Sequence, residues 1–230
     1  MVTAHPDDVD FGAAGTVAAF TAAGLEVTYC IVTNGEAGGS DRSLSRVEMA
    51  ALRQDEQRAA AAAVGVSDVH FLGHPDGRVE ATQELRRDIS RVIRQVRPQR
   101  VITQSPERNW ESMYASHPDH LAAGEAAVCA VYPDARNPFA HPELLEVEGL
   151  EPWTAGEIWI MGPVIKGASI AVETTATVER KVNALLCHKS QIGDPDGVAD
   201  RIRTWARASG ETAGLPEGSS AELFRVVLIP

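Results

Sequence analysis

Apolar residues along the first half of the chain follow two alternating patterns. Short β-branched and apolar runs predict strands at residues 26–33, 68–72 and 100–104. Helix-forming composition or helical apolar spacing predicts helices at residues 45–64, 82–96 and 117–131. Strands and helices in this order indicate a mostly parallel sheet with helices on both faces, which is a Rossmann-like three-layer α/β/α fold.

The second half of the chain is less regular, and we expect it to extend the same domain. Four prolines between residues 133 and 152 predict a loop or lid. Beyond it we expect strands at 157–161, 168–172 and 222–229 and helices at 177–188 and 198–208. The single domain then consists of a core (1–131), a Pro-rich segment (132–155) and a C-terminal extension of strands and helices (156–230).

The beginning of the chain is short for a central strand. Only Met1 to Ala4 precede the first loop, whereas such a strand usually has about five residues. Either the first strand is short, or native residues precede Met1.

The composition is that of a soluble globular protein. Hydrophobic residues make up 44% of the 230 residues and charged residues 23%, which excludes wholesale disorder. No apolar run approaches the ~18 residues of a membrane span, and the first eight residues do not have the pattern of a signal peptide. Three widely spaced cysteines predict no disulfide framework and indicate a reducing, cytoplasmic location.

The charge balance narrows the range of partners. The chain has 21 Lys and Arg against 32 Asp and Glu, a formal net charge of −11. It therefore has no basic footprint for nucleic acid and is unsuited to anionic membrane surfaces. We expect a small-molecule partner.

Groups that can bind a metal follow the predicted strands. Residues 5–8 (His-Pro-Asp-Asp) come directly after the first strand, and residues 117–120 (His-Pro-Asp-His) end the loop after the fourth. Glu36 and Asp76 lie in the loops after the second and third strands. Because ligands bind beyond the carboxyl ends of parallel strands, we expect these side chains to meet at one edge of the sheet.

The spacing within the two motifs suits one metal ion. His5 and Asp8 are three residues apart in a turn, and His117 and His120 have the same spacing on one face of a helix start. Two imidazoles and one carboxylate leave a coordination position open, as in catalytic zinc sites, and the same set can hold Fe(II). Asp7 would then be a free carboxylate close to the metal-bound water, where it suits a general base.

The two motifs, Ala4-His-Pro-Asp-Asp8 and His117-Pro-Asp-His120, resemble those of the LmbE-like or PIG-L family of zinc-dependent N-deacetylases. Three further segments fit that family: residues 33–38, Arg53 with Glu56, and residues 71–77. The resemblance covers about residues 2–190 and implies the LmbE-like fold.

The resemblance also implies roles for single residues. The implied metal ligands are His5, Asp8 and His120. The implied catalytic residues are Asp7 as general base, His117 as the group that polarises the carbonyl or protonates the departing amine, and Asp119, which would orient His117.

Three residues match positions for substrate. Arg53 and Asp76 correspond to residues that hold substrate hydroxyls in sugar-deacetylating relatives, and Glu36 lies in a loop of the same pocket. Simpler interpretations stay open, because Arg53 and Glu56 also fit a solvated helix face and Glu36 and Asp76 also fit turns.

Other residues have weaker claims to the site. Asp10 stands near the position where many relatives have Glu, so we expect it to support the metal ligands from behind. His188 fits either a helix end or a place near the pocket. Trp110 and Tyr114 precede His117 and fit either the core or contact with substrate.

The residues and the resemblance together predict a metal-dependent hydrolase that removes an N-acetyl group from an amino sugar or sugar conjugate. Zinc would activate its bound water and polarise the carbonyl, while Asp7 takes the proton and His117 stabilises the oxyanion. The alternative is an amidase of a thiol or sugar conjugate, or an antibiotic-tailoring deacylase, with the same chemistry. These enzymes would differ in a pocket wall that residues 133–152 could form. By analogy with relatives, a homo-oligomer is plausible.

Two other classes of function fit less well. A nucleotide-binding module needs Gly-x-Gly-x-x-Gly in the first turn, which here is the anionic His-Pro-Asp-Asp. A metal-binding protein without catalysis would have no use for Asp7, His117 and Asp119.

Overall fold

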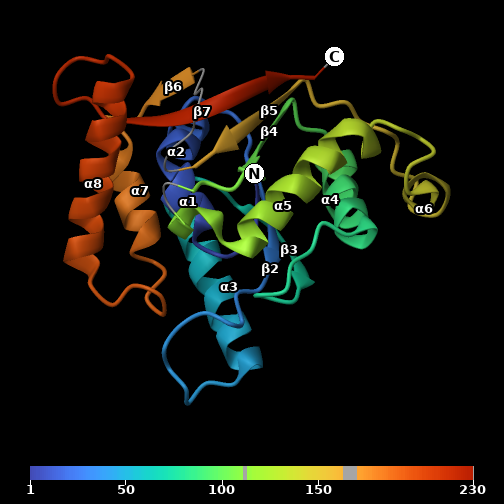
Figure 1. Cartoon of the computed structure of the whole chain (residues 1–230), viewed down its shortest axis with the longest axis horizontal. Coiled ribbons are helices and arrows are strands. Elements are labelled where there is room, and N and C mark those ends of the chain that lie inside the picture. The colour runs from blue at the N-terminus through green and yellow to red at the C-terminus, as the bar shows by residue number, and fades with distance from the viewer. Residues whose placement is uncertain (111–112, 163–169, 230) are drawn as a thin grey trace.

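A mixed sheet with the strand order β3-β2-β1-β4-β5-β7-β6 runs through the middle of the molecule (Figure 1). The structure is a computed structural model, and it describes residues 1–110, 113–162 and 170–229. Strands β1 to β5 pair in parallel, and β7 is antiparallel to its neighbours β5 and β6. The strands are β1 Val2–Thr3, β2 Thr28–Thr33, β3 Asp68–His74, β4 Arg100–Gln104, β5 Glu157–Met161, β6 Ile170–Glu173 and β7 Ala221–Leu228.

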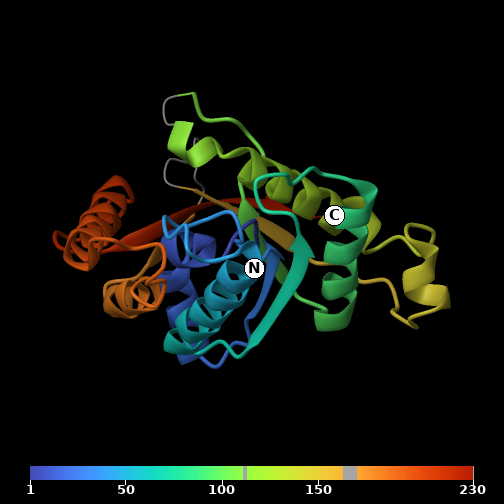
Figure 2. The same ribbon diagram turned by 90° about the horizontal axis from the view of Figure 1, so that it is seen from below.

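Helices cover both faces of the sheet, as Figure 2 shows, and this confirms the predicted fold class. One layer contains α1 Asp8–Gly12, α2 Ala14–Ala22, α3 Arg46–Ala63, α7 Val178–Leu185 and α8 Pro195–Thr212. The other layer contains α4 Gln83–Val96 and α5 Pro118–Cys129. Shorter elements are a 3-10 turn at Met113–Ser116, a π-helical turn at Ala130–Asp134 and α6 at Pro142–Glu146.

Side chains of β2 divide the core into two layers. Cys30 and Val32 pack with apolar residues of α4 and α5, whereas Tyr29 and Ile31 pack with residues of α2 and α3. All four side chains are buried. Side chains alternate along a strand, so a strand that is apolar on both faces needs a helix layer on each side.

Local signals in the sequence set the position of α3. Ser45 accepts a hydrogen bond from the backbone of Glu48, and the Glu48 carboxylate accepts one from the backbone of Ser45, which is a capping box. Toward the other end, Ala60 and Ala61 are fully buried, so the helix lies close to the sheet. The start of the helix is thereby fixed near the carboxyl ends of the strands.

A close approach also sets the position of α5. Pro118 occupies the first turn, where its missing N–H costs nothing. Farther along, Gly124 lies so near the Gln104 carbonyl that no Cβ would fit. This contact holds the middle of α5 against the end of β4.

The Pro-rich segment lies at the end of the sheet where the parallel strands begin, opposite to their carboxyl ends. Arg94 near the end of α4 donates to the backbone carbonyls of Ala135 and Asn137, at 3.1 and 2.9 Å. Trp153 donates through Nε1 to the Pro98 carbonyl just before β4, at 2.7 Å. The prediction of a lid or pocket wall is therefore wrong, because these contacts hold the segment where β4 begins. The segment also contains α6, which the prolines did not predict.

The three strands predicted for the C-terminal extension are present as β5, β6 and β7, and they complete the sheet. The buried Glu222 of β7 accepts hydrogen bonds from the Lys181 ammonium of α7 and the Thr16 backbone of α2, at 2.6 and 2.7 Å. The predicted strand at 168–172 is seen from Ile170 onward, because 168 and 169 lie outside the described residues. Within the described parts of the chain, the helices are too short or too polar to cross a membrane.

Candidate metal centre and catalytic site

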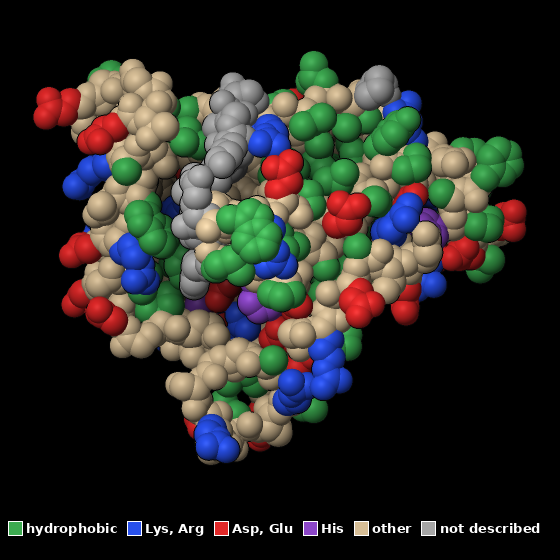
Figure 3. Space-filling view, in the orientation of Figure 1, with side chains coloured by type: hydrophobic (Ala, Val, Ile, Leu, Met, Phe, Trp, Pro, Cys, Tyr) green, Lys and Arg blue, Asp and Glu red, His purple; other side chains and the backbone are tan. Residues whose placement is uncertain are grey.

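Loops and helix starts at the carboxyl ends of β1, β3 and β4 bring the predicted metal-binding groups together. His5 comes from the loop after β1, Asp8 begins α1, and His120 comes from the first turn of α5. The His5 and Asp8 side chains are nearly buried. Near the centre of Figure 3, histidine atoms lie beside acidic and basic atoms at the surface.

The three expected ligands converge. His5 Nδ1 is 3.2 Å from His120 Nε2 and 3.4 Å from an Asp8 carboxylate oxygen. The other Asp8 oxygen is 3.0 Å from His120 Nε2. Two imidazole nitrogens and a carboxylate around one point are a donor set that suits zinc or Fe(II) with a position left open. The residues present therefore fit a divalent cation.

The other ring nitrogen of His5 faces two further carboxylates. His5 Nε2 is 3.1 Å from Asp76 Oδ1 and 3.2 Å from Asp119 Oδ2. A metal-binding histidine commonly gives its second N–H to a carboxylate, which fixes the ring and its tautomer. The geometry thus gives His5 one nitrogen for a metal and one for the groups that orient the ring.

The environment of His5 is strongly negative. Burial lowers the pKa of His5, but hydrogen bonds with Asp119, Asp76 and Asp8 outweigh it and raise the pKa to about 12. Burial raises the pKa of Asp8, yet His120 and His5 hold it well below its ordinary range. The pKa values of Asp76 and Asp119 are likewise lowered, against burial, mainly by their hydrogen bonds with His5. The cluster therefore favours a positive charge at its centre.

His117 completes a group of three imidazoles. Its ring centroid is 5.1 Å from that of His5 and 5.2 Å from that of His120. Its Nδ1 accepts a hydrogen bond from the Asp119 backbone N–H at 3.2 Å, which assigns the proton of the neutral ring to Nε2. Burial and the charges of the other two histidines lower the pKa of His117. His117 can therefore act as a neutral hydrogen-bond donor.

We expected Asp119 to orient His117, and the structure gives its side chain further partners. Its carboxylate accepts hydrogen bonds from the backbones of Gly77 and Val79 at 2.7 and 3.2 Å, and it contacts His5. Its backbone N–H donates to His117 Nδ1, a contact that fits the expected orienting role. Asp119 therefore contacts His117 through its backbone, and His5 and the loop after β3 through its side chain.

Asp7 lies directly beside Asp8 in an unusual backbone conformation. Its φ is 86°, in the left-handed region that non-glycine residues seldom adopt. Burial and the charge of Asp8 raise the pKa of Asp7 to about 6, against the opposing charge of Arg53. A carboxylate with a pKa near neutrality is suited to accept and return a proton.

The three expected substrate-binding residues mainly contact protein. Arg53 is 4% exposed, and both of its terminal nitrogens donate to protein oxygens. Asp76 accepts from the Ala37 backbone at 2.8 Å, and Glu36 accepts from the Asp76 backbone at 2.9 Å. In the structure, these side chains hold the loops of the site against one another.

Sequence reasoning missed two glutamines. Gln57 accepts a hydrogen bond from the Asp7 backbone N–H at 2.8 Å, and Gln104 accepts one from the Ala4 N–H at 2.9 Å. Gln104 is a polar residue at the end of an apolar strand, which is a usable signal. Gln57 is four residues after Arg53 on the same helix face.

The weaker candidates divide into buried and exposed residues. His188 and Asp10 are fully buried and bonded to each other, and Glu56 accepts hydrogen bonds from Ser190. Neither His188 nor Glu56 is therefore a simple surface residue. Trp110 is exposed in the loop before His117. The Tyr114 side chain lies outside the described part of the chain.

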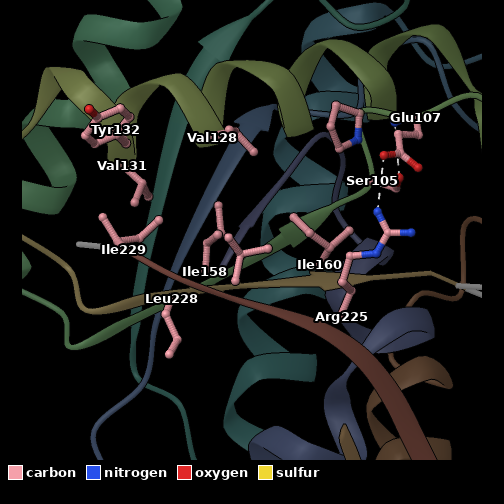
Figure 4. A pocket seen from close by; sticks show the side chains of 12 residues that line it. Ser105, Glu107, Val128, Val131, Tyr132, Ile158, Ile160, Arg225, Leu228 and Ile229 are labelled. Atoms are coloured by element: carbon pink, nitrogen blue, oxygen red, sulfur yellow. Dashed lines mark hydrogen bonds and ion pairs between the residues drawn. The ribbon is translucent and has the colours of Figure 1, made fainter. Parts of the chain in front are cut away.

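A separate groove lies between α5 and the strands β5 and β7 (Figure 4). Ile158, Ile160 and Val131 form much of its wall. The Arg225 guanidinium in the groove donates to the Glu107 carboxylate at 3.2 Å. The groove is mainly apolar, so we place the chemistry at the histidine and aspartate cluster.

Comparison with known proteins points to the same family as the two motifs. Residues 1–131 match the model of the PIG-L family, described as GlcNAc-PI de-N-acetylase. The diacetylchitobiose deacetylase of Thermococcus kodakarensis is 31% identical over 214 residues, which cover 91% of this chain and 76% of that protein. A probable N-acetyl-alpha-D-glucosaminyl L-malate deacetylase 2 of Bacillus anthracis is 31% identical over 198 residues, with 83% and 80% covered.

Solved structures agree on the fold. The N,N'-diacetylchitobiose deacetylase of Pyrococcus horikoshii has a TM-score of 0.87 at 30% identity, with 97% of this chain and 81% of that chain covered. The 4-carboxy-2-hydroxymuconate hydratase of Pseudomonas putida has a TM-score of 0.82 at 20% identity, with 100% and 95% covered. The second likeness shows the fold alone, because one fold can carry different reactions. With the family model matched over residues 1–131 and 31% identity along most of the chain, this protein belongs to the PIG-L family, as its two motifs predicted.

Proposed function

We propose that this protein is a zinc-dependent N-deacetylase that hydrolyses the acetamide of an amino sugar or sugar conjugate. The observation that carries the proposal is the convergence of His5, Asp8 and His120, with Asp7, a carboxylate outside this ligand set, directly before Asp8 in the chain. A binding protein needs the three ligands but not the adjacent carboxylate. A hydrolase needs both, because water must lose a proton as it attacks.

In this proposal His5, Asp8 and His120 hold the metal. A divalent cation at this point supplies a Lewis acid that makes water more acidic and the amide carbonyl more electrophilic. Asp76 and Asp119 keep the His5 ring in place through its Nε2. Their negative charge makes the imidazole a stronger donor to a cation.

Asp7 accepts a proton from the attacking water and later returns it to the amine. As the new C–O bond forms, the Asp7 carboxylate accepts that proton. As the C–N bond breaks, the amine nitrogen must gain a proton, and protonated Asp7 can return it. The products are acetate and a free amine. The raised pKa of Asp7 suits both transfers.

His117 is placed to stabilise the developing oxyanion. Because its Nδ1 accepts the Asp119 N–H, its Nε2 carries a hydrogen that can point at the carbonyl oxygen. A donor of this kind is typically worth about 3 kcal/mol in the transition state. Direct protonation of the departing amine by His117 is the second role open to it.

Sugar substrates are supported by the relatives. The two relatives at 31% identity carry the names of a diacetylchitobiose deacetylase and a glucosaminyl malate deacetylase. We therefore choose an N-acetylated glucosamine unit as the substrate class.

The test is acetate release from N-acetylglucosamine, N,N'-diacetylchitobiose and N-acetylglucosaminyl malate. The metal-free protein would be compared with protein loaded with zinc or with Fe(II). We expect metal-dependent release that falls ~10²- to 10⁴-fold in Asp7→Asn, because a general base typically contributes that much.

A matched control is Asp55→Asn, which changes an exposed aspartate on α3. It should release acetate at the rate of the unchanged protein. Tight zinc binding without release from any of the three compounds would contradict the proposed substrate class. Failure to bind zinc or Fe(II) would contradict the metal centre itself.

A further inference from the structure

The backbone of Asp7 has a left-handed conformation that residues with a side chain seldom adopt. Its φ of 86° is uncommon for any residue with a side chain. Such a conformation persists only where the surroundings determine it, and it often marks a functional site. Asp7 is also pinned from both sides, because its N–H donates to Gln57 and its carbonyl accepts from the Phe11 N–H.

One face of α3 reaches Asp7 at two points. Arg53 donates through Nη2 to the Asp7 carboxylate at 3.1 Å and to the Pro6 carbonyl at 2.7 Å. Gln57 lies one turn later and accepts from the Asp7 backbone at 2.8 Å. Residues four apart on a helix share a face, so one rigid element holds both the side chain and the backbone of Asp7.

A buried polar chain holds Gln57 in turn. Its Nε2 donates to Asp10 Oδ2 at 2.9 Å, and the same oxygen is 2.8 Å from His188 Nε2. Gln57, Asp10 and His188 are all fully buried. Because the Gln57 oxygen faces the Asp7 N–H, its amide nitrogen must face Asp10, so the direction of each hydrogen bond is determined.

This row of buried, hydrogen-bonded side chains lowers the stability of the fold. Asp10 Oδ1 and His188 Nδ1 are buried and have no hydrogen-bond partner among the described residues. Buried polar atoms without partners are destabilising and uncommon. A cost of this kind next to a strained residue indicates that the arrangement serves the site.

We propose that Arg53, Gln57, Asp10 and His188 are positioning residues that hold Asp7 in its left-handed conformation with its carboxylate beside the metal centre. The inference rests on the proposed role of Asp7 as general base. It assigns Arg53 to the base instead of to substrate hydroxyls. The buried His188 then acts through Asp10 and Gln57, although it comes from the C-terminal part of the chain.

The first test pairs Gln57→Met with Gln54→Met, two identical changes on the same helix. Methionine keeps the length of glutamine but neither accepts from Asp7 nor donates to Asp10. We expect Gln57→Met to lower kcat by ~10- to 100-fold, since a misplaced catalytic group typically costs about that much. KM and zinc affinity should stay unchanged, and Gln54→Met should match the unchanged protein.

The second test pairs Arg53→Met with Arg58→Met and adds Arg53→Lys. Arg58 is on the same helix and half-exposed. Positioning predicts a fall in kcat for Arg53→Met with KM unchanged, and partial recovery in Arg53→Lys, whose ammonium can still pair with Asp7. A rise in KM with kcat unchanged would show that Arg53 binds substrate and would overturn its assignment here.

A readout without substrate separates this inference from the proposed function. Hydrogen exchange of the Asp7 amide should be slow in the unchanged protein and at least about tenfold faster in Gln57→Met, because the buried partner is gone. If the unchanged protein deacetylates no sugar but this difference is found, the proposed function fails and the positioning network stands. If the protein is active and kcat and exchange are the same in Gln57→Met and Gln54→Met, the inference is overturned.

Discussion

The tripeptide His-Pro-Asp lies at the carboxyl ends of both β1 and β3, and its side chains are directed oppositely at the two places. In the loop after β1, His5 points into the cluster and Asp7 lies beside it. At the end of β3, His74 points away and its Nε2 is 3.2 Å from Asp88 of α4, while Asp76 in the following loop points inward to His5. The same three residues thus place either the histidine or the aspartate at the metal centre.

The reason lies in the strand that carries each loop. His74 is the last residue of β3, and its side chain reaches α4, the helix layer against which Leu72 of the same strand packs. His5 comes after β1 has ended, so its direction follows the turn that leads into α1. A motif therefore has a role only together with its place relative to the strand end.

The largest effect should distinguish the two histidines. His5→Ala removes a proposed ligand, so we expect a loss of zinc affinity of more than about 100-fold, above the range typical for residues behind the ligands, and loss of activity. His74→Ala should leave both unchanged. Competition titration with a chromophoric chelator and the acetate assay measure the two quantities. Equal zinc affinity in the two variants would contradict the ligand assignment.

The aspartates of the two loops, Asp7 and Asp76, should differ in the quantity that each substitution changes. Asp7→Asn removes the base and should lower kcat by ~10²- to 10⁴-fold with zinc affinity kept. Asp76→Asn weakens the partner of His5 and should lower zinc affinity by about tenfold. Steady-state kinetics at saturating zinc would separate them, because only Asp7→Asn should stay slow. Full recovery of Asp7→Asn by added zinc would argue for a ligand instead of a base.

Metal binding should also stabilise the fold. Zinc at 100 times its Kd contributes ~2.7 kcal/mol by mass action, and for a chain of this length this raises Tm by about 5–10 °C. The increase should be present in His74→Ala and absent in His5→Ala. Thermal unfolding with and without a chelator measures it. A similar increase in both variants would place the stabilising ion elsewhere.

The smallest effect concerns Asp88, the carboxylate that pairs with His74. Burial raises the pKa of Asp88, but hydrogen bonds from Arg91 and Arg87 outweigh it and hold the pKa below its ordinary value. Its charge therefore stabilises the fold above the ordinary carboxyl pKa of ~3.9, and this stability is lost as the pH falls through the lowered value. Asp88→Asn should cost about 1 kcal/mol at pH 7.

Urea unfolding of Asp88→Asn and of the unchanged protein, at neutral pH and near pH 3, tests that expectation. The difference between the two proteins should shrink at the acidic pH. A difference that is the same at both values would mean that the Asp88 charge does not contribute.

The sequence predicted most elements of the core for a clear reason. Strands such as β2 and β4 are buried on both faces and therefore appear as short β-branched and apolar runs, and α3 carries its own capping box. The Pro-rich segment was harder. Prolines exclude a long helix but do not say which edge of the sheet a segment covers, and Arg94 decides that through the backbone carbonyls it binds.

The candidate site shows the same division. His5, Asp8 and His120 could be predicted because each motif has a short spacing within a turn or a helix start, where geometry is local. The contacts of the Asp119 and Arg53 side chains could not be predicted, because their partners are distant in sequence and are brought close only by the fold. Asp119 contacts residues 5 and 77, and Arg53 contacts residues 6, 7 and 35.

By itself the sequence predicted the layered α/β fold from its periodicity, the family from the resemblance of its two motifs, and candidate metal-binding residues from their short-range spacing. Only the tertiary structure decided what surrounds the base. Residues 57, 10 and 188 meet behind Asp7 because α3, α1 and the segment that follows α7 pack on the same side of the sheet. Hydrogen bonds between residues far apart in the sequence leave no periodic pattern in it. These side chains bond to one another because they are buried, where water cannot replace a protein partner.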